Sequence, residues 1–124
     1  MKIAKKEDGF TILEVLVASA ILSIGLLGIL SMMTTAMHAN AYSEAYITAN
    51  NLIIDQAEAM RRLGYGNITP GTDTSSIFTR AWTVTPDPFV PDLLQTVTVT
   101  VTWQKASDSI QHRINTTFSV GRAI

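Results

Sequence analysis

Residues 10–33 read FTILEVLVASAILSIGLLGILSMM, an apolar run of 24 residues in which Glu14 is the only charged side chain. At about 1.5 Å rise per residue, a helix of this length spans roughly 36 Å, slightly more than the ~30 Å hydrocarbon thickness of a bilayer. We therefore expect this run to be a helix that crosses a membrane.

The positive charges around this run give it a direction. Lys2, Lys5 and Lys6 precede it, whereas no Lys or Arg follows until Arg61. Cytoplasmic flanks of membrane helices carry the excess of Lys and Arg, so we expect the amino end to be cytoplasmic. The rest of the chain is then expected on the other side of the membrane.

The helical pattern continues after the apolar run with lower hydrophobicity. Its apolar positions recur at spacings close to 3.6 and are Tyr42, Tyr46, Ala49, Ile53 and Met60. No proline occurs before Pro70, so nothing forces an earlier end. The sequence predicts one helix over residues 10–63, about 80 Å long at full helicity, which ends at Gly64 and Gly66. Its second half, residues 34–63, is predicted to be amphipathic.

The segment after the helix is predicted to be a loop followed by strands. Residues 64–76 are rich in Gly, Pro, Asn, Asp, Ser and Thr, which is typical of a loop. Residues 95–104 alternate strictly between apolar and polar side chains, which is typical of a strand with one buried face. That face is predicted to consist of Val97, Val99, Val101 and Trp103.

Two further strands are predicted beside this one. Residues 110–120 repeat the alternation, and residues 105–109 form a connection of hairpin length, so the two strands should pair antiparallel. The inward face of the later strand is predicted to contain Ile110, His112, Ile114, Phe118 and Val120. An earlier strand over 78–85 is separated from the others by the proline-containing segment 86–93. The sequence therefore predicts an α+β fold, in which a sheet of three to four strands within residues 64–124 packs on the amphipathic half of the helix.

Composition argues against several classes of function. The chain has 124 residues, a formal net charge of −1 and no cysteine. After Gly9 it carries 6 basic against 8 acidic residues, which disfavours nucleic acid as a partner. His38 and His112 lack the spacing of metal ligands, and no catalytic or phosphate-binding motif is present. We therefore expect no enzyme, no cofactor and no metal site.

Glu14 requires a specific explanation. A carboxylate near the centre of a membrane helix costs about 2.5 to 3.5 kcal/mol on insertion scales, and less near an interface. A plain membrane anchor gains nothing from it. A cut between Gly9 and Phe10 would create an α-ammonium one helical turn from Glu14. We expect Glu14 to pair with this ammonium, either in its own chain or in a neighbouring one.

The string KKEDGFTILEV, residues 5–15, resembles the class III signal of type IV prepilins. The shared features are a short basic leader, Gly, Phe, Thr, two aliphatic residues, Glu and a long apolar helix. The resemblance implies a type IV pilin-like fold and a leader, residues 1–9, removed by prepilin peptidase between Gly9 and Phe10. The peptidase/methyltransferase would then N-methylate Phe10, and Glu14 would serve methylation or docking into the filament.

Two glycines in the apolar run have two alternative explanations. Gly25 and Gly28 lie where the helices of assembled pilins often loosen, and glycine is disfavoured in a helix by about 1 kcal/mol relative to alanine. Close helix packing through small residues is the equal alternative. The apolar run, residues 10–33, is the predicted transmembrane and filament-core part in either case.

Later segments are similar to minor pilins of the pilus-modification (PilV) type and to the small minor pseudopilins of type II secretion. The matching strings are IGLLGILSM at 24–32, NNLIIDQAEAMRR at 50–62, VTVTVTW at 97–103 and TTF at 116–118. The resemblance implies a minor pilin incorporated into a type IV pilus or priming it. A minor pseudopilin is the alternative, and a DNA-uptake or adhesive pilin is less favoured.

The partners and location implied by this resemblance are those of a bacterial inner-membrane prepilin. The chain would be a single-pass protein in the lipid bilayer with its carboxyl-terminal part in the periplasm, and it would later belong to a pilus or pseudopilus. Its partners would be other pilins and minor pilins, prepilin peptidase and the inner-membrane assembly platform.

Two other interpretations of the amino terminus remain. An ordinary secretory signal peptide would use Ala39-Asn40-Ala41 as an A-x-A site, although its apolar core would be unusually long. An uncleaved single-pass anchor is the second alternative. The mature chain would start at Phe10, Tyr42 or Met1, respectively.

Overall fold

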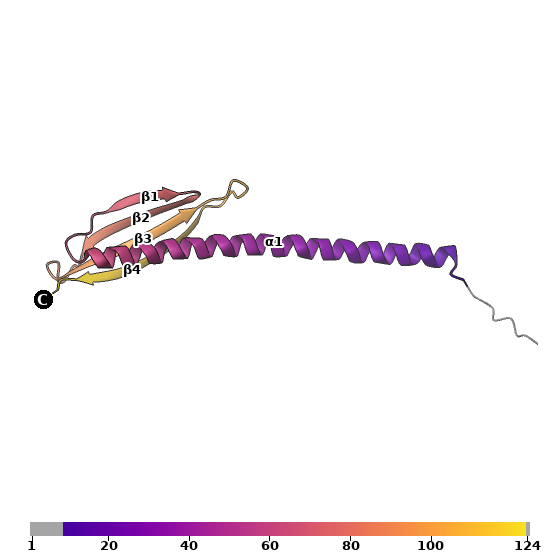
Figure 1. The fold of residues 1–124 in the computed structure, drawn as a ribbon, viewed down its shortest axis with the longest axis horizontal. Helices are drawn as coiled ribbons and strands as arrows, with labels where there is room; N and C mark the ends of the chain where they lie inside the picture. Colours follow the sequence, from indigo (N-terminus) through magenta and orange to yellow (C-terminus); the bar gives the residue numbers. More distant parts are fainter. Residues whose placement is uncertain (1–8, 124) are drawn as a thin grey trace, which may run out of the picture. The chain divides into compact units, whose positions relative to one another are not determined.

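The computed structural model describes residues 9–123, so that the leader residues 1–8, with Lys2, Lys5 and Lys6, lie outside the described residues. The elements are α1 (Ile12–Leu63), β1 (Gly71–Ser75), β2 (Phe78–Pro86), β3 (Leu94–Trp103) and β4 (His112–Gly121), as Figure 1 shows. The chain divides into two compact units, residues 1–42 and 43–124, and α1 contributes to both.

Helix α1 has nearly the predicted bounds. It begins at Ile12, two residues later than expected, and ends at Leu63 as expected. Gly64 and Gly66 have φ angles of 76° and 80°, the left-handed conformation that terminates helices and that other residues rarely adopt. The side-chain amide of Asn67 donates to the carbonyl oxygen of Leu63 at 3.0 Å and satisfies one of the last helical carbonyls.

The sheet belongs to the second unit and has four antiparallel strands in the order β1-β2-β3-β4. The long central strand β3 places Val99 between Trp82 of β2 and Thr116 of β4. The predicted pairing of the last two strands is therefore confirmed. Both outer strands, β1 and β4, are edges of the sheet within the described residues.

Strand β1 corrects the prediction of a loop over residues 64–76. Residues 71–75 pair with β2, with Asp73 directly opposite Arg80. Arg80 Nε donates to Asp73 Oδ1 at 2.9 Å, and the two side chains form an ion pair. The strand has no buried residue, so ladder hydrogen bonds and this pair hold it in place rather than apolar burial.

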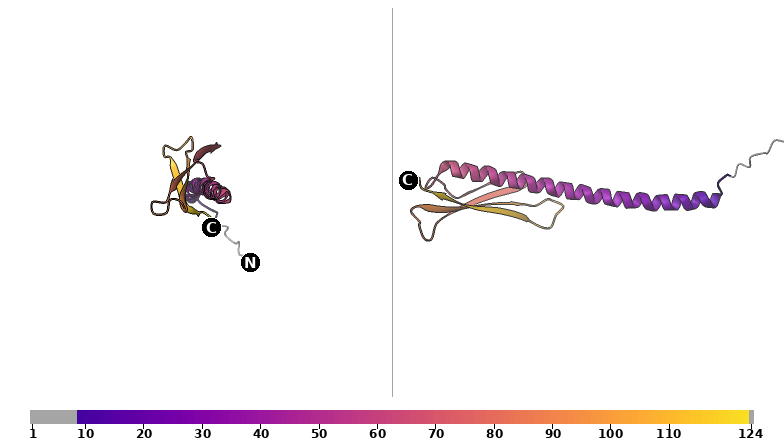
Figure 2. Two further views of the ribbon diagram at one scale, coloured as in Figure 1. Left: turned by 90° about the vertical axis from the view of Figure 1, so that its left-hand side faces the viewer. Right: turned by 90° about the horizontal axis from the view of Figure 1, so that it is seen from below.

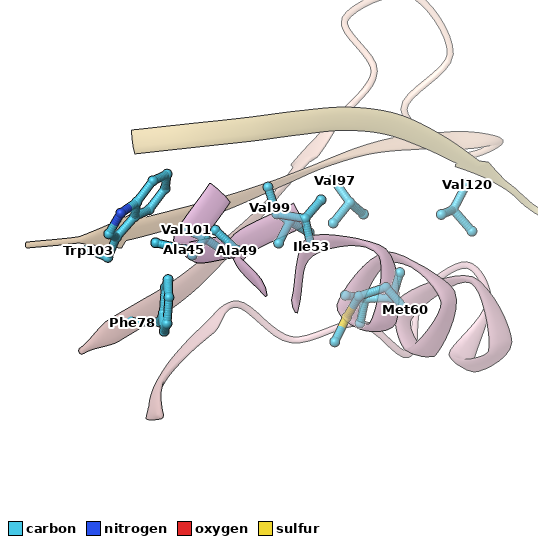
Figure 3. Close-up of a cluster of buried hydrophobic side chains, with 11 residues drawn as sticks. Ala45, Ala49, Ile53, Met60, Phe78, Val97, Val99, Val101, Trp103 and Val120 are labelled. Atoms are coloured by element: carbon cyan, nitrogen blue, oxygen red, sulfur yellow. The ribbon is translucent and has the colours of Figure 1, made fainter. Parts of the chain in front are cut away.

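The core of the second unit forms where residues 43–63 of α1 lie across one face of the sheet (Figures 1 and 2). Val97, Val99 and Val101 are fully buried, which confirms the predicted inward face of β3. The side chains that meet there are Ala45, Ala49, Ile53 and Met60 from α1 and Phe78, Val97, Val99, Val101, Trp103 and Val120 from the sheet (Figure 3).

The predicted apolar stripe of the helix is wrong at its tyrosines. Tyr42 and Tyr46 expose 51% and 48% of their surface, and Ala45 is buried in their place. Small side chains let the helix backbone come close to the valines of β3, where a tyrosine would not fit. Tyr46 instead packs edge-on against Trp103, with ring centroids 6.4 Å apart.

Ile110 is also misplaced in the predicted inward face of the last strand. It exposes 62% of its surface and lies before β4, which begins at His112. Its backbone N–H donates to Asp108 Oδ1 at 3.0 Å, which binds it into the β3–β4 turn. His112, Ile114, Phe118 and Val120 face inward as predicted, half-buried or buried.

Candidate functional site: the amino end of the apolar helix

The first turn of α1 brings together the residues that the sequence singles out. Gly9, Phe10 and Thr11 precede the helix, and Glu14 lies in its first turn. The backbone N–H of Glu14 donates to Thr11 Oγ1 at 3.2 Å, and Glu14 Oε2 accepts from the backbone N–H of Thr11 at 3.3 Å. Thr11 and Glu14 therefore form a reciprocal capping box.

This cap corrects the expectation that an uncleaved anchor gains nothing from Glu14. The carboxylate satisfies a backbone donor at the helix start and lies at the positive end of the helix dipole. An N-terminal cap contributes about 1 kcal/mol, and a carboxylate at the end of the apolar run costs less than the roughly 2.5 to 3.5 kcal/mol that it costs at the centre of a bilayer. The cap thus explains why the acid is three residues after Thr11. Its partners, a backbone N–H and a hydroxyl, are uncharged and do not neutralise the carboxylate of Glu14.

The rest of the first unit is an apolar helix surface without cover. Every large hydrophobic side chain from Phe10 to Met37 exposes between 51% and 87% of its surface. By length and composition, α1 is the helix among residues 9–123 that could cross a membrane. Such a surface needs lipid or other helices around it.

Two serines within the apolar run hydrogen-bond inside the helix. The hydroxyl of Ser19 donates to the carbonyl oxygen of Val15 at 2.7 Å. The hydroxyl of Ser23 donates to the backbone carbonyl oxygen of Ser19, also at 2.7 Å. Both hydroxyls are therefore satisfied without water or a partner subunit. Glu14 differs from them because it carries a charge.

Gly25 and Gly28 lie inside α1 and are helical. A Cβ atom on either would meet nothing within 4 Å in the described chain. No contact within the described chain therefore requires glycine at these two positions.

A shallow groove lies nearer the start of the helix and has a volume of about 370 Å³. The residues that line it are Phe10, Glu14, Val15, Ala18, Ser19 and Leu22.

The second unit has a polar cluster around His112 that was not predicted from the sequence. His112 Nε2 lies 2.6 Å from Asp108 Oδ2, and the imidazole stacks on Trp103 with ring centroids 5.4 Å apart. The hydrogen bond with His112, then that from the backbone N–H of Ile110, hold the pKa of Asp108 below its usual value of 3.8. The turn between β3 and β4 brings the Asp108 carboxylate and the His112 imidazole together. No sequence motif predicts this pair.

The acidic and histidine side chains of the described residues do not gather into a metal site. No group of three or more His, Asp or Glu side chains among residues 9–123 could hold a metal ion. Asp73 pairs with Arg80, and Asp87 accepts from the backbone N–H groups of Phe89 and Val90. These carboxylates have structural partners within the second unit.

Comparison with known proteins bears on the amino-terminal segment. Residues 4–30 match the family model of the prokaryotic N-terminal methylation motif. No curated protein and no solved structure matches the chain. The matched residues contain Gly9, Phe10, Glu14, Gly25 and Gly28.

The match supports a class III signal of the type IV prepilin kind. A long helix on a four-stranded antiparallel sheet is an α+β, type IV pilin-like arrangement. The motif implies processing by prepilin peptidase and assembly with pilins, and the apolar helix fits membrane anchoring. The motif thus supports a type IV pilin-like protein and suggests a structural subunit rather than an enzyme.

Proposed function

We propose that the chain is a minor subunit of a type IV pilus, made as a single-pass prepilin of the bacterial inner membrane. Prepilin peptidase cleaves it between Gly9 and Phe10, and Phe10 is N-methylated. The observation that carries this proposal is the capped acid, Glu14, at the start of an uncovered apolar helix and inside a methylation-motif match.

In this proposal the parts of the chain have separate tasks. Residues 1–9 are the cytoplasmic leader and are removed. Residues 10–33 lie in lipid before assembly and among other pilin helices afterwards, which changes their apolar surroundings little. Residues 34–63 carry the amphipathic half of the helix, and residues 64–124 supply the periplasmic β part, which packs on it.

Glu14 would position the subunit in the filament. Cleavage creates the α-ammonium of Phe10 close to the carboxylate, in a layer from which water is excluded. A charge left alone in that layer is strongly penalised, so a register that pairs Glu14 with an ammonium of its own or a neighbouring chain is favoured. Gly25 and Gly28 would serve either local loosening or close packing of the helix in the fibre.

The mature amino terminus tests the proposal. Mass spectrometry of the protein from cell envelopes should find a chain that starts at N-methylated Phe10. A Gly9→Val variant, which places a bulky residue before the cut, should keep residues 1–9 and serves as the control. A wild-type chain that starts at Met1 would be an uncleaved anchor and one that starts at Tyr42 a secreted protein, and either result overturns the proposal.

The host machine is tested separately. A pull-down of the tagged chain from membranes should co-purify pilins and the pilus assembly platform. Co-purification of a type II secretion system would instead make the chain a minor pseudopilin. The excess of acidic residues after Gly9 argues against a DNA-uptake tip, and a gel-shift assay with duplex DNA should show no complex.

A further inference from the structure

A groove between α1 and the edge strand β4 has a lining that the proposed function does not use. Its volume is about 310 Å³, within the range of roughly 300 to 1,000 Å³ that is typical of small-ligand sites. Six of its ten lining residues have polar side chains, and they are Tyr46, Asn50, Glu58, Arg61, Asn115 and Thr116. The other four are isoleucine or alanine, so the groove combines polar groups with apolar surface.

The groove is elongated. On α1 its lining extends from Tyr46 to Arg61, a distance of roughly 22 Å along the helix at about 1.5 Å per residue. On β4 its lining consists of the consecutive residues 114–116. Successive side chains of a strand point to opposite faces, so the groove follows the outer edge of β4 rather than one face of the sheet. This shape suits a chain-like ligand better than a single small molecule.

Several polar side chains of the groove have no polar partner within the described chain. Among residues 9–123, no hydrogen bond or ion pair involves the side chains of Asn50, Arg61, Asn115 and Thr116. Arg61 is held by packing, with its guanidinium carbon 4.9 Å from the ring centroid of Phe118, so its N–H donors remain available. These side chains are carried by a helix and a strand, which hold their spacing fixed before a ligand binds.

The charges of the groove indicate the class of ligand. Glu58 and Arg61 both line it, so an anionic ligand drawn to the guanidinium would also face a carboxylate. An apolar ligand would cover the carboxamides and both charges without giving them partners, which is costly. A hydroxyl group donates and accepts at once, so an uncharged ligand rich in hydroxyls satisfies acids, bases and amides together. The apolar C–H surface of a sugar ring also matches the aromatic ring of Tyr46 and the side chain of Ile114.

We propose that the α1–β4 groove binds a neutral oligosaccharide. The carboxamides of Asn50 and Asn115 bind sugar hydroxyls from opposite walls of the groove. Glu58 accepts hydrogen bonds from the sugar and Arg61 donates to it, while Tyr46 packs on the ring. The inference goes beyond the proposed function, because it gives a structural subunit a ligand site of its own.

An NMR titration of the full, uncleaved chain tests this site. The ¹⁵N-labelled protein is held in micelles of a polyoxyethylene detergent, whose headgroup is not a sugar and does not compete. The probes are maltotetraose and chitotetraose, which are neutral, and tetragalacturonate, which is a matched anionic oligosaccharide. At least one neutral probe should shift the side-chain amide signals of Asn50 and Asn115 saturably. The corresponding signals of Asn51 and Asn67, which do not line the groove, should stay in place.

Substitutions of neighbouring asparagines make the result specific. Asn50→Ala should raise the Kd of the neutral probe about tenfold, because hydrogen bonds to the sugar are lost. Asn115→Ala should do the same from the opposite wall. Asn51→Ala is the matched control, at an exposed position of the same helix outside the groove, and should leave the Kd unchanged. Asn50 and Asn115 are exposed, so their truncation leaves the core intact, and backbone amide spectra check the fold of each variant.

Three results would contradict the proposal. The first is the absence of saturable shifts with both neutral probes, which means that the groove holds solvent alone. The second is tighter binding of tetragalacturonate than of either neutral probe, which indicates an anion site. The third is an equal loss of binding in Asn50→Ala and Asn51→Ala, which places the sugar elsewhere. Because the uncleaved chain is used, none of these results affects the mass-spectrometric test of processing.

Discussion

A Cβ atom on Gly71 would lie 2.6 Å from Cζ2 of Trp82, the residue directly opposite it in the β1–β2 ladder. The indole therefore occupies the space that any side chain at position 71 would need. Trp82 is fixed in turn, because its Nε1–H donates to the carbonyl oxygen of Thr69 at 2.8 Å. The close approach of one glycine and one tryptophan thus sets where β1 begins.

Gly71→Ala should lower the free energy of unfolding by about 1 to 3 kcal/mol, the usual cost of forcing an extra group into an occupied space. Denaturant unfolding of the full chain in micelles, followed by tryptophan fluorescence, measures the change. Gly121→Ala is the matched control, because its Cβ would meet Leu93 O at an ordinary 3.8 Å. Equal stabilities of the two variants would show that β1 does not depend on this contact.

The cap and the charge of Glu14 can be separated by substitution. Glu14→Gln keeps a side-chain acceptor for the Thr11 N–H but removes the charge, whereas Thr11→Ala removes the hydroxyl and keeps the charge. We expect Glu14→Gln to be absent from sheared filaments and Thr11→Ala to be incorporated, with a helix start weakened by about 1 kcal/mol. Immunoblots of filament and membrane fractions measure this. If the Glu14→Gln variant is incorporated into filaments normally, the charge of Glu14 is not needed for assembly and its role is limited to capping the helix.

Acid should destabilise the second unit through two carboxylates. The hydrogen bond from Arg80 lowers the pKa of Asp73, and the hydrogen bond with His112 lowers the pKa of Asp108, each from 3.8. The folded state binds these protons less readily than the unfolded state, so the stabilisation is complete above pH 3.8 and is lost as the pH falls below it. Urea midpoints between pH 5 and pH 2.5 should therefore fall with pH.

The variant Asp73→Asn with Asp108→Asn should show a flatter profile over the same pH range. Asp55→Asn, at an exposed position of α1, is the control and should keep the wild-type slope. An unchanged slope in the double variant would mean that other groups cause the acid sensitivity.

Ala49 should not tolerate a larger side chain. It is fully buried in the cluster that also contains Val97 and Val99. Ala49→Leu should cost about 1 to 3 kcal/mol of stability through overpacking. Ala59→Leu, on the exposed face of the same helix, should be nearly neutral, and the two are compared by denaturant unfolding. If Ala49→Leu leaves the stability unchanged, there must be free space between the helix and the sheet at this position.

The helix and strands in which apolar residues recur at a regular spacing could be predicted from the sequence. The end of α1 follows from Gly64, and the buried face of β3 follows from alternation at Val97, Val99 and Val101. The prediction that Tyr42 and Tyr46 face the sheet was wrong, because Ala45 fits the helical spacing to Ala49 and Ile53 as well as Tyr46 does. Only the fit against the valines decides which of the two faces the sheet.

The remaining differences come from contacts between distant residues. Residues 71–75 have the composition of a loop. They form a strand by pairing with β2, where Gly71 lies opposite Trp82 and Asp73 opposite Arg80. In the candidate site, the roles of Gly9, Phe10 and Glu14 stay predictions from the sequence, whereas the cap was not predicted. The spacing Thr11-x-x-Glu14 before an apolar run is a known capping signal and could have revealed it.

The internal hydrogen bonds of Ser19 and Ser23 have a consequence for how such a helix could leave a membrane. Both hydroxyls carry their acceptors with them, so exchanging acyl chains for protein neighbours would leave their hydrogen bonding as it was. Glu14, at the start of the run, carries the formal charge of that segment. Moving the helix between the two surroundings therefore changes the environment of a carboxylate, but not the hydrogen bonding of these two hydroxyls.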